Sequence, residues 1–117
     1  MKKERLETVE KMIGWALDKK AEDVVHIDVE GKTEFTDSII ICHGTADLHV
    51  RAIAQYIIDQ AKENKIRLLG AEGMDNSTWI LLDFGDIIVH IFNAETRDYY
   101  NLEDLYKLSP KNREKEK

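Results

Sequence analysis

The chain contains little cysteine and little proline. Its 117 residues include one cysteine, Cys42, and one proline, Pro110. A lone cysteine cannot form a disulfide within the chain, and this scarcity is typical of the reducing cytoplasm, where we expect the protein to act. With 43% hydrophobic and 34% charged residues, the composition excludes a disordered chain and indicates one globular domain with one core.

Long hydrophobic runs are also absent. Apolar stretches such as residues 39–42 are far shorter than the roughly 20 residues that a membrane helix needs. No apolar segment follows the basic residues of the N-terminus, so we expect no secretory signal. The sequence therefore predicts no association with a membrane.

Positive charge is not in excess either. The formal net charge is −6, and the basic residues are spread among acidic ones. A protein that binds nucleic acid mainly through phosphates needs a basic stripe. We therefore expect no nucleic acid as the main contact, and an acidic chain instead favours a basic protein partner.

Hydrophobic periodicity predicts the elements in the first part of the chain. Residues 4–20 have helical spacing, residues 23–29 alternate as in a half-buried strand, and residues 38–42 are apolar on both faces, as in a covered strand. The apolar stripe of the first helix is expected to consist of Leu6, Val9, Ile13, Ala16 and Leu17. Thr45 is expected to cap a second helix, and residues 66–71 to form a third strand. The order strand, helix, strand predicts a right-handed parallel crossover.

A β-hairpin is predicted at residues 78–83 and 86–92, with Phe84 and Gly85 as its turn. In this register Trp79 lies directly opposite His90. One face of the hairpin is wholly apolar and consists of Ile80, Leu82, Ile87, Val89 and Ile91. The other face is mixed and consists of Trp79, Leu81, Ile88, His90 and Phe92. A slip of one residue would exchange the two faces, so the apolar face specifies which residues point to the core.

Two short helical turns are predicted after the hairpin, capped by Asn93 and Asn101. Ser109-Pro110 is expected to end the second, which leaves residues 109–117 as a charged tail after a domain of residues 1–108. The predicted order is α-β-β-α-β-β-β-α. This order indicates a single α/β (mixed α+β) domain, with a mixed sheet of about five strands and flanking helices.

Acidic side chains suggest one alternative function, that of a nucleotide-binding or nucleotidyltransferase-type enzyme. Asp28 and Glu30 share a strand face and could hold Mg²⁺, and Gly44-Thr45 at a helix start could hold a phosphate. No Gly-Ser turn precedes the two acids, as it does in active enzymes of such folds. A solvated or turn role for the acids is therefore favoured over catalysis.

Cysteine and histidine provide weaker signals. Cys42 and His43 are adjacent on a strand and point to opposite faces, so they cannot pair as nucleophile and base. The four histidines lack close metal-ligand spacing, although His43 and His49 could approach each other across the strand-to-helix loop. We therefore expect no catalytic residue, no cofactor and no metal.

Ten short motifs occur in order along the chain. They are Phe35-Thr36-Asp37, His43-Gly44-Thr45, His49-Val50-Arg51-Ala52-Ile53, Glu72-Gly73, Trp79-Ile80-Leu81-Leu82-Asp83, Gly85-Asp86, Val89-His90-Ile91-Phe92, Arg97, Tyr99-Tyr100 and Leu102-Glu103. Together they resemble the ribosomal silencing factor family (RsfS), also called the iojap-like proteins. The resemblance implies a non-enzymatic domain with a nucleotidyltransferase-like fold. It further implies binding to the large ribosomal subunit, through the large-subunit ribosomal protein numbered fourteen, and a block on subunit joining when nutrients are scarce.

The mixed hairpin face is the predicted binding site. From the residues alone, Trp79 fits a core position and an interface position about equally; the resemblance assigns it to the ribosomal-protein contact, with His90, Arg97 and Tyr100 beside it. The predicted partner-binding residues are Trp79, Leu81, Asp83, Ile88, His90, Phe92, Arg97 and Tyr100. A further alternative is a dimerisation module, in which the apolar hairpin face pairs with itself to form a homodimer of the free protein.

Overall fold

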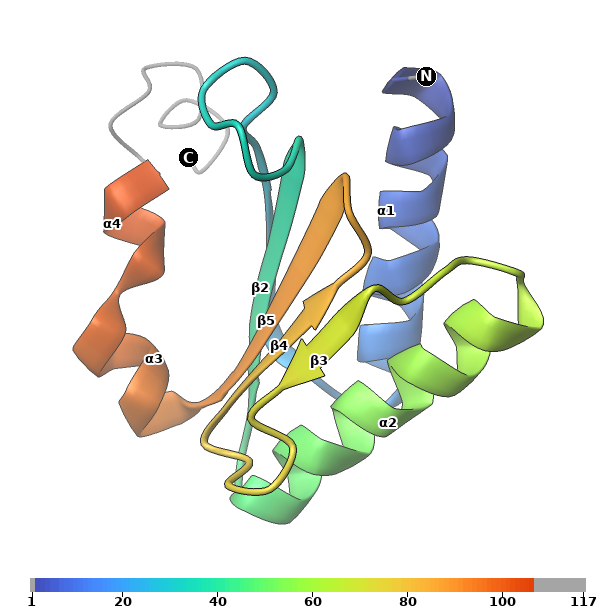
Figure 1. Ribbon diagram of the computed structural model, residues 1–117. Helices are drawn as coiled ribbons and strands as arrows, with labels where there is room; N and C mark the ends of the chain where they lie inside the picture. The colour runs from blue at the N-terminus through green and yellow to red at the C-terminus, as the bar shows by residue number, and fades with distance from the viewer. Residues whose placement is uncertain (1, 107–117) are drawn as a thin grey trace.

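A five-stranded mixed sheet forms the middle layer of the molecule (Figure 1). The computed structural model describes residues 2–106. The strands are β1 (Glu22–Asp28), β2 (Ser38–Gly44), β3 (Gly70–Glu72), β4 (Trp79–Asp83) and β5 (Ile87–Asn93). Their order across the sheet is β1-β2-β5-β4-β3, with β2 and β5 parallel and every other neighbouring pair antiparallel. The predicted mixed sheet of about five strands is confirmed.

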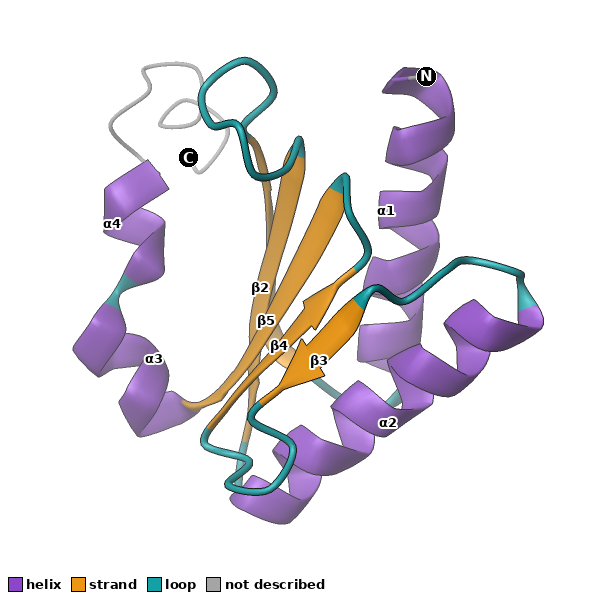
Figure 2. Ribbon diagram, in the orientation of Figure 1, coloured by secondary structure: helices purple, strands orange, loops and turns teal. Residues whose placement is uncertain are grey.

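Helices lie on both sides of this sheet (Figure 2). The two long helices, α1 (Lys2–Asp18) and α2 (Asp47–Glu63), cover one face, and the two short ones, α3 (Ala94–Tyr100) and α4 (Leu102–Tyr106), lie on the other. Asn101 separates α3 from α4 because its backbone adopts the left-handed conformation, with φ at 49°. The α/β class and the predicted order of elements are thus confirmed, with two short helices after β5 where the predicted order has one.

The main core lies between the sheet and the two long helices. It contains all five residues of the apolar hairpin face, each at most 2% exposed, packed with Val9, Met12, Ala16, Val50, Ile53 and Ile57. The prediction that this face is the core side of the hairpin is confirmed. Because α1 and α2 cover it, the predicted self-pairing through this face is wrong. The homodimer of the free protein itself stays a prediction.

The buried stripe of α1 differs from the predicted one. Its buried residues are Arg5, Val9, Met12 and Ala16. Leu17 is 54% exposed, and Leu6 and Ile13 are half-buried. Arg5 occupies an inward position because the sheet beneath it is polar, and its Nε donates to the Ser38 hydroxyl at 2.9 Å.

The predicted crossover is correct in that β3 is parallel to β2, but β3 does not lie next to β2. β3 runs in the same direction as β2, because it is antiparallel to β4, which is antiparallel to β5, which is parallel to β2. Two strands, β5 and β4, nevertheless lie between β2 and β3. β3 is also shorter than the predicted strand of residues 66–71, although the Leu69 N–H still donates to the Asp83 carbonyl at 2.7 Å.

The hairpin turn lies one residue later than predicted. Gly85 and Asp86 form the turn, and the Phe84 N–H donates to the Ile87 carbonyl at 2.9 Å across it. Gly85 has φ at +93°, which glycine adopts without strain at the first central position of a II′ turn. The register therefore moves by two residues, so that Trp79 lies opposite Phe92, and His90 opposite Leu81. A shift of two preserves the assignment of every side chain to its face.

The helix caps are only partly as predicted. Thr45 does not cap α2, since the N-cap is Ala46 and makes no side-chain cap bond. The Thr45 N–H instead donates to His49 Nδ1 at 2.9 Å. Asn93 does cap α3, and its side chain accepts from the Thr96 N–H at 2.9 Å.

The predictions for the C-terminal end lie outside the described residues. They concern the stop at Ser109-Pro110 and the charged tail of residues 109–117. Within residues 2–106, no helix is both long enough and apolar enough to cross a membrane.

Candidate functional site

The face of the sheet opposite α1 and α2 is only partly covered. A small cluster of Ile27, Val29, Ile39, Ile41 and Phe92 forms its buried part, with Leu102 of α4 and Trp79 packed against it. Further along β4 and β5, the side chains of Leu81, Asp83 and Ile88 are half-buried. We call the accessible surface formed by Trp79, Leu81, Asp83, Ile88 and Tyr100 the Trp79 face.

Trp79 is held in one orientation by three aromatic neighbours. Its ring stacks on Phe92, with centroids 5.1 Å apart and planes at 30°, and lies 4.5 Å from the Tyr100 ring. Its indole Nε1 donates to His90 Nδ1 at 3.1 Å. The side chain is half-buried, so one side packs on the protein and the rest is accessible. A large, rigid, partly exposed aromatic group of this kind is typical of the centre of a binding interface.

His90 orients Trp79. It is 6% exposed, and burial lowers the pKa of its imidazole to about 4. Because an indole N–H can only donate, His90 Nδ1 must be the acceptor and the ring proton is on Nε2. His90 therefore supplies no charge to a partner at neutral pH and fixes the indole ring instead.

Phe92 and Arg97 are also buried members of the predicted set. Phe92 is fully buried beneath Trp79, and Arg97 is 6% exposed. Arg97 donates from Nε and Nη2 to the two carboxylate oxygens of Glu103, at 3.1 and 2.8 Å. Its Nη1 donates to His43 Nδ1 at 2.8 Å. Arg97 therefore joins α3 to α4 and to the sheet, so His90, Phe92 and Arg97 support the face while the other five residues form its surface.

Sequence reasoning left Tyr99 out of the site. Tyr99 is 83% exposed and Tyr100 is 49% exposed, and their rings meet edge to face at 5.2 Å. A shallow cavity of about 380 Å³ lies beside them, lined by Thr78, Glu95, Thr96, Tyr99 and Tyr100. The accessible aromatic surface therefore continues from Trp79 across the end of α3. The signal in the sequence was the pair of consecutive tyrosines, because two adjacent residues on one short helix cannot both point inward.

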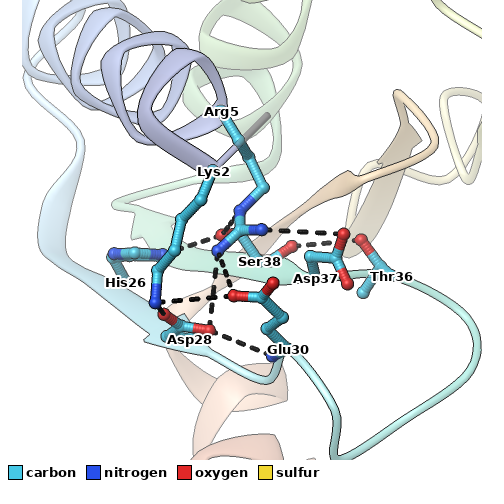
Figure 3. Close-up of polar contacts among 8 residues, drawn as sticks. All are labelled: Lys2, Arg5, His26, Asp28, Glu30, Thr36, Asp37 and Ser38. Carbon is cyan, nitrogen blue, oxygen red and sulfur yellow. Dashed lines mark hydrogen bonds and ion pairs between the residues drawn. The ribbon is translucent and has the colours of Figure 1, made fainter.

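The acids of the enzyme alternative face cations of the chain itself (Figure 3). Arg5 Nη2 lies 3.6 Å from Asp28 Oδ1 and 3.5 Å from Glu30 Oε1. Lys2 Nζ lies 3.8 Å from Asp28 Oδ2 and 3.5 Å from Glu30 Oε1. Arg5 is buried, and its Nη1 also lies 3.6 Å from Asp37 Oδ2. These contacts neutralise the two carboxylates from α1, a role that the sequence did not predict. The predicted solvated role is wrong for Asp28, which is buried, whereas its Oδ1 accepts from the Glu30 N–H at 3.0 Å, as in the predicted turn role.

The structure does not bring these acids to the predicted phosphate site. Asp28 pairs with Ser38, at the start of β2, whereas Gly44-Thr45 lies at the end of that strand. Six residue steps along a strand separate the two places by roughly 20 Å. His49 also packs over this helix start, since a Cβ added to Gly44 would lie 3.0 Å from its Nδ1.

The cysteine and histidine predictions are resolved by burial and by hydrogen bonds. Cys42 is fully buried on the α1 and α2 side, and burial raises the pKa of its thiol to about 12. His43 is on the other side, against Arg97, while His49 Nε2 contacts the Lys19 carbonyl at 2.7 Å. The two histidines do not converge. Across the described part of the chain, no group of three or more His, Cys, Asp and Glu side chains could hold a metal ion.

Comparisons with known proteins agree on one family. A family model described as "Ribosomal silencing factor during starvation", RsfS, matches residues 2–117. "Ribosomal silencing factor RsfS" of Bacillus subtilis is 47% identical over 93 residues, which are 80% of this chain and 79% of that protein. The mouse "Mitochondrial assembly of ribosomal large subunit protein 1" is 30% identical over 103 residues, which are 86% of this chain and 45% of the mouse protein.

Solved structures agree with this relationship. A crystal structure of a Chromobacterium violaceum protein superposes with a TM-score of 0.84 at 30% identity, covering 86% of this chain and 84% of that one. The resemblance seen in the motifs is thus confirmed by overall sequence and by fold. The chain belongs to the RsfS family of ribosomal silencing factors, and its role is a ribosome-associated silencing one.

Proposed function

We propose that this chain is a cytoplasmic translational repressor that binds the large ribosomal subunit and sterically blocks joining of the small subunit when nutrients are limiting. Its direct partner would be the large-subunit ribosomal protein numbered fourteen, on the face that meets the small subunit. The "during starvation" of the family description and the "ribosomal large subunit" in the name of the mouse relative support the setting. The proposed role is a binding role and involves no chemical reaction.

The Trp79 face is the observation that carries this proposal. It is an accessible aromatic surface whose main side chain is already held by Phe92, Tyr100 and His90. Interface centres combine such anchors with a partly polar surround. Here Asp83 and the polar residues that line the cavity beside Tyr99, which are Thr78, Glu95 and Thr96, provide it. Little side-chain freedom has to be lost on binding, because the indole ring is ordered beforehand.

Replacement of the anchor tests the binding role. Trp79→Ala is expected to abolish co-sedimentation with purified large subunits and to restore the joining of large and small subunits in the presence of the protein. Truncation of a central aromatic residue costs at least about 2 kcal/mol of binding free energy, or about thirtyfold in affinity. The measurement is a sedimentation titration, with circular dichroism to verify that the variant is folded.

Tyr56→Ala is the matched control, because Tyr56 is another half-buried aromatic residue but lies on α2, across the sheet. This variant is expected to bind like the wild type. If folded Trp79→Ala still binds, or if Tyr56→Ala loses binding to the same extent, the Trp79 face is not the docking surface. Failure of the wild type to bind large subunits would overturn the proposed function itself.

A further inference from the structure

We propose that Arg51 and Ser77 position the Trp79 face for its partner. Arg51 lies on α2, on the far side of the sheet, and fastens the loop of residues 73–77 that leads into β4. This inference rests on the proposed function and adds to it two positioning residues outside the binding face. Figure 1 shows the β3–β4 loop beside the first turns of α2.

The guanidinium of Arg51 donates three hydrogen bonds to the loop. Its Nε donates to Ser77 Oγ at 3.0 Å. Its Nη2 donates to the carbonyl oxygens of Met74 and Asp75, at 2.7 and 2.9 Å. Bonds from a charged donor are stronger than neutral ones, and the planar guanidinium fixes direction as well as distance. The Arg51 side chain of α2 therefore holds the loop at residues 74, 75 and 77.

The backbone conformation of the loop at Ser77 needs contacts from outside the loop to hold it. Ser77 is buried and has φ at +65°, a region in which residues other than glycine are strained. Its N–H donates to the Gly73 carbonyl at 2.8 Å, and its hydroxyl donates to the Met74 carbonyl at 3.1 Å. Such strain persists only where surrounding contacts determine the conformation.

The fastened loop lies directly against the backbone of Trp79. Gly73 has φ at +86°, and a Cβ built on it would lie 2.0 Å from the Trp79 carbonyl oxygen. The loop and the first residue of β4 are therefore in close backbone contact. A change in the path of the loop moves the position from which the indole ring projects.

The first turn of α2 also holds the other half of the aromatic pair. Asp47 Oδ1 accepts from the Asn93 side-chain amide at 3.0 Å, and Asn93 is the N-cap of α3, which carries Tyr100. The Asn93 N–H donates to the Thr78 carbonyl at 3.1 Å. The start of β4 and the start of α3 are thus both attached to α2, which explains how Trp79 and Tyr100 keep their rings 4.5 Å apart.

Release of the loop should disturb the binding face more than the fold. Met74 is the loop residue that packs partly against the core, whereas Asp75 and Asn76 are exposed. Stability comes mainly from buried apolar area, which Arg51 and Ser77 hardly supply. We therefore expect variants at these two residues to stay folded and to bind poorly.

The test is a double-mutant cycle of Arg51→Ala and Ser77→Ala, measured as affinity for purified large subunits. Each single variant is expected to bind about tenfold more weakly, and the double variant less weakly than the product of the two single effects, because both single variants remove the Arg51–Ser77 hydrogen bond. Ser77→Ala carries no change of charge, so it separates positioning from a direct ionic contact of Arg51 with the partner. If Ser77→Ala binds like the wild type, the positioning proposal is wrong.

Two further measurements make the result decisive. Arg67→Ala removes an exposed arginine outside the loop and is expected to bind like the wild type, which controls for net charge.

In a Trp15→Phe background, the fluorescence of Trp79 reports the face without any partner. Arg51→Ala is expected to make this fluorescence easier to quench with acrylamide. Unchanged quenching would contradict the proposal.

Failure of the inference and failure of the proposed function give different results. If the wild type binds, Trp79→Ala does not bind, and both Arg51→Ala and Ser77→Ala bind normally, only the positioning role is overturned. If the wild type itself does not bind large subunits, the proposed function is overturned, and the quenching of Trp79 still decides whether Arg51 positions it.

Discussion

The predicted site residues divide into the accessible side chains of the Trp79 face and the buried side chains that support it. Trp79 and Tyr100 are accessible, while His90 and Phe92 lie beneath them and fix the indole ring. His90 can accept the indole N–H only while its Nδ1 is unprotonated. The binding surface is therefore linked to the protonation of a buried histidine that a partner does not reach.

This linkage predicts an acid-sensitive stability. The pKa of His90 is lowered from 6.5 to about 4 in the folded protein, so between these values the unfolded chain binds a proton there and the folded chain does not. Stability is thus full above pH 6.5 and falls as the pH decreases toward 4. Relative to His90→Gln, which retains an acceptor but does not titrate, the wild type should lose on the order of 3 kcal/mol across this window.

Urea denaturation of both proteins at a series of pH values measures this difference. The other titrating groups are common to both proteins, so they cancel in the comparison. Parallel curves for the wild type and His90→Gln would show that His90 is not responsible.

At the scale of elements, polar contacts of Arg97 connect the two short helices to each other and to the sheet. α3 and α4 cover only part of their face of the sheet, and Leu102 is a half-buried apolar contact of α4. Arg97 of α3 donates to Glu103, His43 and the Glu22 carbonyl. Because α3 also carries Tyr100, this network holds an element of the binding face.

The network predicts a strong coupling between Arg97 and Glu103. Arg97→Met removes two charged hydrogen bonds from the Glu103 carboxylate and should destabilise the protein by about 3 kcal/mol. The double variant Arg97→Met with Glu103→Leu should be destabilised by less than the sum of the two single changes, since both single changes remove the same charged hydrogen bonds. Denaturant titrations of the four proteins measure the coupling, and simple additivity would show that the pair does not act as a unit.

At the scale of the whole molecule, two layers of helices serve different purposes. α1 and α2 bury the apolar hairpin face and complete the core, and the opposite face is the one that we propose for binding. The chain is also acidic overall, with a net charge of −6. A field of this sign accelerates encounter with a basic protein surface and disfavours non-specific contact with rRNA.

The charge predicts a salt-dependent association rate with large subunits. Stopped-flow measurements should show slower association as the salt concentration rises. Asp83→Asn, on the Trp79 face, should slow association more than Glu10→Gln, which removes an exposed acid of α1. The two variants change net charge equally, so equal rates would show that the field near the face does not steer binding.

The sequence by itself determined which residues form each face of the hairpin, where the long helices lie, and that Asn93 caps α3. These features depend on neighbours a few positions away, through side-chain alternation, helical spacing and local capping. The faces were correct even though the register was wrong, because a shift of two residues preserves alternation. The motifs, too, were sufficient to identify the family.

Only the tertiary structure decided the strand order, the burial of Arg5, the support of Trp79 by His90 and the hold of Arg51 on the β3–β4 loop. Arg5 and Ser38 are 33 positions apart, and Arg51 and Ser77 are 26 apart. Contacts at such separations depend on how all the elements pack together, because local propensity does not encode which distant polar groups will meet. The surface that we propose as the binding face can therefore be predicted from alternation along two strands, whereas the contacts that hold it in place depend on the packing of the whole molecule.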